Sequence, residues 1–220
     1  MIPTCLRLIA VALAFILVVV STSSAFDSPL SDTAVREAYF LGQHHDQIFA
    51  DFLQKYVVAL PEPKNGPHIA SISFFTPYAV AAIYSNQQSG SYSAQKAQLD
   101  HRKQSEFVRI VVQIWFTASY GEYIIHPADS RSNSPNGFEV RPYDFWRRFR
   151  VRVFQKEQFL VPVYANGEPS LMCLDDCDLS GATLTFEYPA DSFTADAVTV
   201  LVAPPEGDPV SVDFDPASLR

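Results

Sequence analysis

The clearest pattern of apolar and polar positions is a helical one in the first third of the chain. Between residues 32 and 60, apolar side chains recur at spacings of three and four, and polar side chains occupy the other side. Ser31 or Asp32 supplies a capping-type start, and Pro61 and Pro63 enforce a stop. The pattern predicts one long amphipathic helix from residue 31 or 32 to residue 60.

The pattern weakens over the next 45 or so positions, where it predicts short elements. Residues 68–75 are a candidate strand, and residues 77–85 are apolar but ambiguous between helix and strand. Residues 93–103 have the composition of a short polar helix, with Ser93 as its N-cap.

From position 106 onward the apolar period changes to two, which is typical of strands. The predicted strands are 107–117, 146–155, 159–164, 183–188, 197–203 and 210–214. Turn residues separate them, notably Asn166-Gly167, Ser180-Gly181 and the proline-rich segment 204–209.

Short strands with no helical pattern between them favour antiparallel sheets over a parallel βαβ sheet. We therefore predict an α+β fold. A helical N-terminal region, residues 26–105, packs on or beside a C-terminal antiparallel β-sandwich of immunoglobulin-like class, residues 106–220.

The first 25 residues have the three-part order of a secretory signal. Arg7 precedes a continuous apolar run, 8–20, and the small residues Ser23 and Ala25 follow it. The run of about 13 residues is shorter than the roughly 20 that a membrane-spanning helix needs. We expect cleavage near Ala25 and a secreted or periplasmic product without a transmembrane segment; an uncleaved anchor is the alternative.

Charge and cysteine content narrow the functional classes. The formal net charge is -8, which argues against nucleic acid as a partner. Cys173 and Cys177 follow the signal, and in an oxidising compartment they are expected to form a local disulfide. Three residues separate them, instead of the two of a thioredoxin-type redox motif.

Four stretches of the chain carry a resemblance to a known group of proteins. They are Arg36-Glu37-Ala38-Tyr39-Phe40-Leu41-Gly42-Gln43, Phe74-Phe75-Thr76-Pro77-Tyr78, Tyr92-Ser93-Ala94-Gln95 and Tyr143-Asp144-Phe145-Trp146. The chain resembles a family of uncharacterised exported proteins of acidobacterial type. The resemblance implies export, and it brings no known activity, cofactor or functional residue.

The histidines do not form a recognisable catalytic motif. His44 and His45 lie in the predicted long helix without metal-binding partners at i+3 or i+4, so we expect a buried His45 and a solvated His44. His101, beside Asp100, and His126, near Asp129, could each be half of an acid-base pair. No nucleophile motif, zinc-binding helix or glycine-rich phosphate loop accompanies them.

One acidic stretch has the spacing of a calcium loop. Asp176, Asp178, Ser180, Gly181 and Glu187 follow the ligand order of a twelve-residue loop, in which alternate oxygens converge on one ion. Such a loop should have helices on both sides, whereas residues 183–188 alternate like a strand. The alternative is therefore an acidic turn that leads into a strand. Calcium is the one cofactor that the sequence suggests.

A basic stretch stands out in the otherwise acidic chain. On a strand, Arg148, Arg150 and Arg152 would share one face, where they could bind carboxylates or phosphates bidentately. The alternative is cross-strand pairing with the protein's own carboxylates. Nearby, the turn-rich stretch 127–137 is flanked by aromatic residues that either cover the end of the core or bind a ligand.

Taken together, these patterns favour an exported, non-enzymatic interaction or envelope-associated protein. Its expected partner is an anionic glycan or an envelope protein, held by the arginine strand and the 127–145 loop. Two alternatives stay open at this point: a secreted hydrolase of envelope or environmental polymers that uses His126 or His101 with carboxylates such as Asp129, and a calcium-stabilised binding module.

Overall fold

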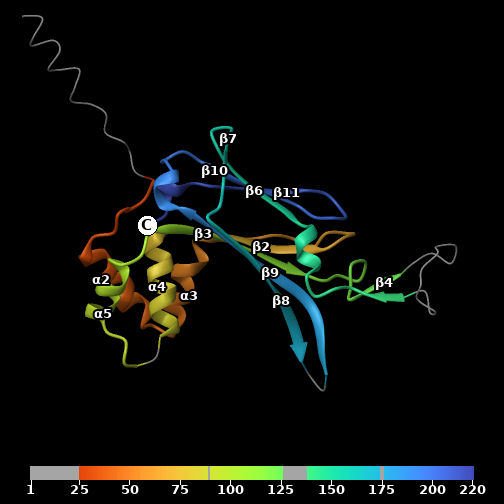
Figure 1. The fold of residues 1–220 in the computed structure, drawn as a ribbon, viewed down its shortest axis with the longest axis horizontal. Coiled ribbons are helices and arrows are strands. Elements are labelled where there is room, and N and C mark those ends of the chain that lie inside the picture. Colours follow the sequence, from red (N-terminus) through yellow and green to blue (C-terminus); the bar gives the residue numbers. More distant parts are fainter. Residues whose placement is uncertain (1–24, 89, 126–137, 174–175) are drawn as a thin grey trace, which may run out of the picture.

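The computed structural model describes residues 25–88, 90–125, 138–173 and 176–220 (Figure 1). The predicted signal segment lies outside the described residues up to position 24. Ala25, beside the expected cleavage site, and Phe26 are both buried in the core. None of the helices in the described ranges is long and apolar enough to cross a membrane.

The helical part consists of α-helices α2 (Asp32–Gly42), α3 (Gln47–Gln54), α4 (Pro77–Gln87) and α5 (Ala94–His101). Each begins at a polar residue whose side-chain oxygen accepts a hydrogen bond from a backbone N–H of the first turn; these caps are Ser31, Asp46, Thr76 and Ser93. The helix predicted after Ser93 is confirmed, and the ambiguous segment 77–85 is helical. The helices share a small apolar core around Ala38, Tyr78 and Ala82.

The single helix predicted over residues 32–60 is wrong. α2 ends at Gly42, a new N-cap at Asp46 starts α3, and strand β1 (Val57–Ala59) occupies the expected last turn. Gly42 lies so close to α4 that a Cβ there would overlap the carbonyl oxygen of Ala82. The apolar spacing continues across the break, so its period could not reveal the two helices.

The larger sheet has five strands in the order β1-β2-β3-β9-β8, and every neighbouring pair is antiparallel. Its other members are β2 (His68–Phe75), β3 (Phe107–Trp115), β8 (Tyr164–Cys173) and β9 (Cys177–Pro189). The turns predicted at Asn166-Gly167 and Ser180-Gly181 are wrong, because both pairs lie inside strands. At Gly181 a Cβ would overlap the carbonyl oxygen of Ile114 on β3, so this glycine permits close strand pairing.

The second sheet has four strands in the order β11-β10-β6-β7. These are β6 (Arg150–Gln155), β7 (Gln158–Leu160), β10 (Val198–Ala203) and β11 (Val210–Phe214). Segment 204–209 joins β10 to β11 as predicted. The strand predicted over 146–155 begins later, because the 3-10 helix η1 (Phe145–Arg148) takes its first part. A ribbon of β4 (Tyr123–Ile125) and β5 (Phe138–Val140) lies outside both sheets.

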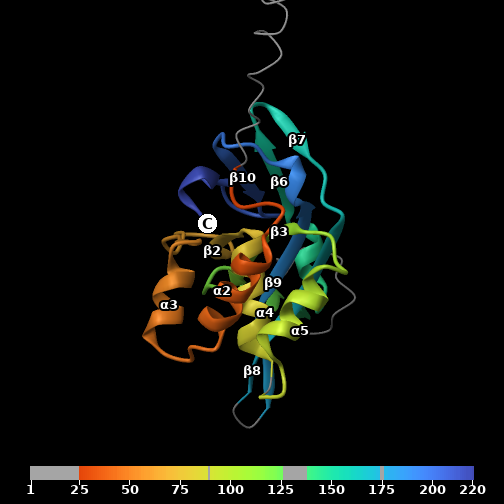
Figure 2. The same cartoon turned by 90° about the vertical axis from the view of Figure 1, so that its left-hand side faces the viewer.

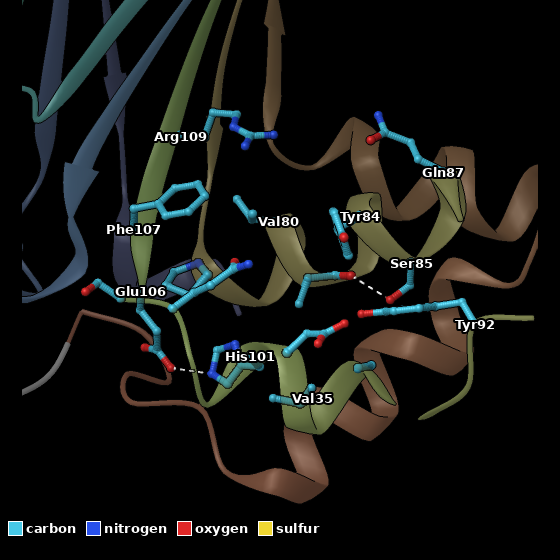
Figure 3. Close-up of a pocket in the computed structure, with 16 residues that line it drawn as sticks. Val35, Val80, Tyr84, Ser85, Gln87, Tyr92, His101, Glu106, Phe107 and Arg109 are labelled. Atoms are coloured by element: carbon cyan, nitrogen blue, oxygen red, sulfur yellow. Dashed lines mark hydrogen bonds and ion pairs between the residues drawn. The ribbon is translucent and has the colours of Figure 1, made fainter. Parts of the chain in front are cut away.

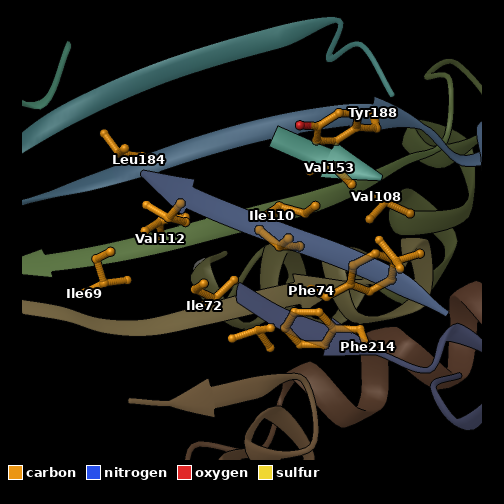
Figure 4. Close-up of a cluster of buried hydrophobic side chains, with 14 of the residues drawn as sticks. Ile69, Ile72, Phe74, Val108, Ile110, Val112, Val153, Leu184, Tyr188 and Phe214 are labelled. Carbon is orange, nitrogen blue, oxygen red and sulfur yellow. The ribbon is translucent and has the colours of Figure 1, made fainter. Parts of the chain in front are cut away.

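Side chains from both sheets meet in one apolar core (Figure 4). On β3 every second side chain is fully buried, as the period of two predicts: Val108, Ile110, Val112 and Ile114. The four-stranded sheet contributes Val153 and Phe214 to the same cluster. Complete burial of such a side chain stabilises the folded state by about 1.5–3 kcal/mol, so this core dominates the stability of the fold. The α+β class with antiparallel sheets is confirmed, and the immunoglobulin-like class stays a prediction.

The helices and the four-stranded sheet lie on opposite sides of the five-stranded sheet. Figure 2 shows the helices below β2 and β3, with β6 and β10 above them. Helix α4 contacts β2 and β3 directly. Strands β1 and β2 belong to the region expected to be helical, residues 26–105, yet they join the larger sheet. The junction of helices and sheet positions the cavity described below.

Candidate functional site

The predicted disulfide is present. Cys173 and Cys177 are bonded, and they face each other as register partners at the end of the β8–β9 hairpin. The hairpin extends away from the helices (Figure 1). The bond closes a short ring in a hairpin tip, which is a structural position.

The predicted calcium loop is not formed. β9 runs extended from Cys177 to Pro189, so Asp178 and Glu187 lie about 30 Å apart at 3.3 Å per residue. The Glu187 carboxylate accepts a hydrogen bond from Arg109 Nη2 at 2.8 Å. Ser180 Oγ donates to the carbonyl oxygen of Ser170. These residues therefore do not converge, and nowhere in the described ranges do three or more His, Cys, Asp or Glu residues group to hold a metal.

The predicted arginine strand exists in part. Arg150 and Arg152 lie on one exposed face of β6, whereas Arg148 belongs to η1 and does not follow the strand alternation. The cross-strand partners on β10 are Ala203 for Arg150 and Leu201 for Arg152. The alternative of pairing with the protein's own carboxylates is therefore wrong for the described residues, in which none of the ion pairs involves these arginines. Arg148, Arg150 and Arg152 are called the arginine surface below.

The aromatic residues around the turn-rich stretch serve different purposes. The stretch itself, 127–137, lies outside the described residues together with its Asp129, and so does His126 just before it. Tyr120 and Phe145 are buried in the main core, which fits the alternative that the aromatic residues cover the end of the core. Arg141 is buried as well, with its guanidinium carbon 3.6 Å from the Tyr120 ring centroid. Tyr143, by contrast, is 61% exposed.

The paired histidines are not a site. His44 and His45 lie in the break between α2 and α3, and both are exposed, so the expectation of a buried His45 is wrong. His45 Nδ1 lies 3.1 Å from Asn86 Nδ2, and the His44 imidazole pairs with Asp46 at 3.5 Å. Both imidazoles therefore make contacts that belong to the connection between α2 and α3.

His101 does meet a carboxylate, although not the neighbouring Asp100. Its Nε2 lies 2.9 Å from Glu106 Oε1, at the start of the segment that leads into β3. Ser28 Oγ donates to the other oxygen of Glu106, and the backbone N–H of Leu30 donates to Oε1, both at 2.6 Å. Burial raises the pKa of Glu106, but these hydrogen bonds outweigh it and hold the pKa below its ordinary value.

This arrangement differs from a catalytic triad of serine, histidine and carboxylate. In such a triad the serine hydroxyl bonds to one imidazole nitrogen, and the carboxylate orients the ring from the other nitrogen. Here the Ser28 hydroxyl bonds to Glu106, and no hydroxyl among the described residues has a hydrogen bond to His101. The network therefore fastens the segment at Ser28 to the start of β3.

A cavity of about 250 Å³ opens beside this network, between helices α2, α4 and α5 and strand β3 (Figure 3). Its apolar wall includes Val35 and Val80, and the aromatic rings of Tyr84, Tyr92 and Phe107 line it. Its polar lining consists of Ser85, Gln87, Asp100, His101, Gln104, Ser105, Glu106 and Arg109. A concave cavity whose apolar and aromatic walls are combined with polar groups is a usual form of a small-ligand site.

The charges around the cavity are unevenly distributed. Arg109 donates from Nε and Nη2 to Glu187 at 3.1 and 2.8 Å, and its guanidinium lies over the Phe107 ring. Burial, and then the negative charge of Asp100, raise the pKa of Tyr92 to about 12. Near Tyr92 the cavity is therefore lined by aromatic rings and the Asp100 carboxylate, while Arg109 in its lining is paired with Glu187.

Sequence reasoning missed Tyr84, Tyr92 and Arg109. One signal was present: Tyr92 directly precedes the N-cap Ser93, and Ala97 is the fourth residue of the helix. An apolar pair at these positions forms a hydrophobic staple, and both residues are buried in the helix core. Tyr84 lies in the ambiguous stretch 77–85, where no period identified its face.

No family model matches this sequence, and no curated protein matches it either. The resemblance to exported proteins of acidobacterial type therefore stays a prediction, and the function has to be argued from the residues.

Proposed function

We propose that this chain is an exported, non-enzymatic interaction protein that binds an anionic polymer on the arginine surface. The expected polymer is an envelope glycan that bears carboxylates or phosphates, and an acidic envelope protein is the other class of partner. The secretory pattern of residues 1–25 and the Cys173–Cys177 disulfide support export. The scaffold in this proposal is an immunoglobulin-like β-sandwich with helices on one side.

The observation that carries the proposal is the unpaired state of Arg150 and Arg152. Both side chains are exposed on the same face of β6, about 7 Å apart along the strand. The protein has 24 acidic and 16 basic residues, yet none of the described carboxylates pairs with these two. A guanidinium that is not neutralised internally can hold a carboxylate or phosphate through two parallel hydrogen bonds.

A single exposed ion pair contributes little, about 0–1 kcal/mol, because water and salt screen it. A polymer with repeated charges can engage several arginines at once, and the second contact then forms intramolecularly. The geometry therefore supports a repeating anion better than a small free one.

The test is retention of the purified protein on immobilised polygalacturonate or a similar polyuronate, together with titration at several salt concentrations. We expect the Arg150→Gln/Arg152→Gln double variant to bind at least about tenfold more weakly and to show a smaller salt dependence. Arg36→Gln/Lys64→Gln is the matched control, because it removes two exposed charges from other parts of the surface. Equal binding by the double variant and the control would overturn the proposal.

A further inference from the structure

The cavity of Figure 3 has an aromatic corner that is held rigidly in place. The rings of Tyr84 and Tyr92 lie edge to face, with centroids 5.7 Å apart and planes at 78°. Tyr92 is only 8% exposed, and the Tyr39 hydroxyl donates to its backbone oxygen at 2.9 Å. Tyr84 is 46% exposed and stands on α4 at the cavity wall (Figure 3). Two rings from separate elements thus line the same space.

A carboxylate lines the same cavity as these two rings. Asp100 lines the cavity from α5, and its charge acts on the Tyr92 phenol. Its ion-pair partners are Lys96 at 3.7 Å and Lys103 at 3.8 Å, whose side chains are 60% and 74% exposed. Pairs of this length with exposed lysines are weak, so a cation inside the cavity could compete for Asp100.

The other charged groups leave the acidic character in place. His101, Ser28 and the backbone N–H of Leu30 already bind Glu106. Arg109 lies next to Phe107 and bonds to Glu187. An anion would therefore meet Asp100 without a free arginine to offset it. A cation would meet both a carboxylate and aromatic rings, and the faces of such rings attract positive charge.

We propose that this cavity binds a small organic cation, an amine or quaternary ammonium that carries one apolar ring or chain. Tyr84 and Tyr92 contact the cationic head beside Asp100, and Val35 and Val80 contact the apolar part. A cavity of about 250 Å³ lies just below the common range for drug-sized ligands, roughly 300–1,000 Å³, so the ligand is the size of a single ring with a short substituent. The site is separate from the arginine surface and would make the protein a binder of two ligands of opposite charge.

The test uses three probes of similar size: benzyltrimethylammonium, benzyl alcohol and benzoate. Calorimetric or NMR titration of the purified protein should give a dissociation constant in about the millimolar range or tighter for the cation, at least about tenfold tighter than for either other probe. Asp100→Asn keeps the shape of the side chain and removes its charge, so it should weaken binding of the cation about fivefold or more. Tyr84→Ala should do the same, and Tyr84→Phe should retain binding because it keeps the ring.

The Arg150→Gln/Arg152→Gln variant is the remote control and should bind the cation as the unmodified protein does. A result in which the alcohol or benzoate binds as tightly as the cation would overturn the proposal. So would the failure of all three probes to bind, or an unchanged affinity in Asp100→Asn. Because the polymer assay and this assay use different residues and probes, each proposal can fail while the other stands.

Discussion

At the scale of single residues, Glu106 shows how a few polar contacts fix the position of a chain segment. Its carboxylate accepts hydrogen bonds from Ser28, from the backbone of Leu30 and from His101, which lie in the segment before α2 and at the end of α5. Only 11% of its side chain is exposed. A buried carboxylate with several donors is stabilised in its charged form, so folding is linked to the ionisation of Glu106.

Glu106→Gln should lower the free energy of unfolding by about 1–3 kcal/mol at pH 7, because hydrogen bonds to a charged acceptor are lost. The folded pKa of Glu106 is depressed, so its contribution is present at neutral pH and is lost as the pH falls from the ordinary value of 4.5 through the folded pKa. Urea unfolding of the two proteins between pH 7 and pH 3 measures this difference, which should shrink toward low pH.

Glu62→Gln, at an exposed loop position, is the control and should change stability little at any pH. A stability difference for Glu106→Gln that is the same at pH 3 and pH 7 would contradict the linkage.

Individual residues could be predicted from the sequence only where the signal is local. The Ser93 cap and the Cys173–Cys177 bond join residues a few positions apart, and both are confirmed. The contact between Glu106 and Ser28 joins positions 78 residues apart, so no local pattern carries it. The sequence pointed to His101 but to Asp100 as its partner; the true partner, Glu106, is only five positions further along the chain but lies beyond the end of α5.

At the scale of elements, the alternation of apolar and polar residues in β3, β10 and β11 could be read from the sequence, because one face of each strand is buried. The Asn166-Gly167 and Ser180-Gly181 pairs gave two wrong turn predictions. The reason is that the residues that favour turns also occur where strands pack tightly. Trp146 covers Gly167 so closely that a Cβ would overlap its indole. Close approach, which depends on the tertiary fold, overrides the local turn preference at both pairs.

Gly181→Ala should lower the free energy of unfolding by about 1–3 kcal/mol, because its methyl group would displace the β3 backbone at Ile114. Gly90→Ala is the matched control, since a Cβ there meets nothing within 4 Å. Chemical denaturation of both variants gives the comparison, and we expect the Gly90 variant to stay within about 1 kcal/mol of the unmodified protein. Equal effects of the two substitutions would show that strand contact at Gly181 is not the cause.

At the scale of the whole molecule, the helical and strand-rich parts of the sequence are interlocked. Composition places a boundary near residue 105, where the period changes from helical to alternating. In the structure, strands from both sides of that boundary pair with each other. Strand β2 pairs with β3, and Ile72 and Phe74 of β2 are fully buried in the core. Pairing between distant strands is a property of topology, which the period of a sequence does not encode.

Residues 106–220 produced alone should therefore fail to reach the native fold. Without β2, strand β3 loses a neighbour, and the core loses Ile72 and Phe74, each worth about 2–5 kcal/mol when truncated to alanine. We expect poor chemical-shift dispersion and no cooperative melt for the fragment. The complete protein in the same buffer should unfold in one transition. A well-dispersed spectrum from the fragment would instead support two independent domains.

The position of strand β8 at the edge of the larger sheet affects whether copies of the protein aggregate. This strand ends the larger sheet, with β9 on one side and no strand on the other within the described ranges. A bare sheet margin of this kind invites edge-to-edge aggregation. Pro169, in the middle of β8, has no amide hydrogen to offer a neighbouring copy, and Glu168 adds an exposed charge that repels its equivalent. The strand that carries the disulfide hairpin thus also protects the protein against polymerisation along its open side.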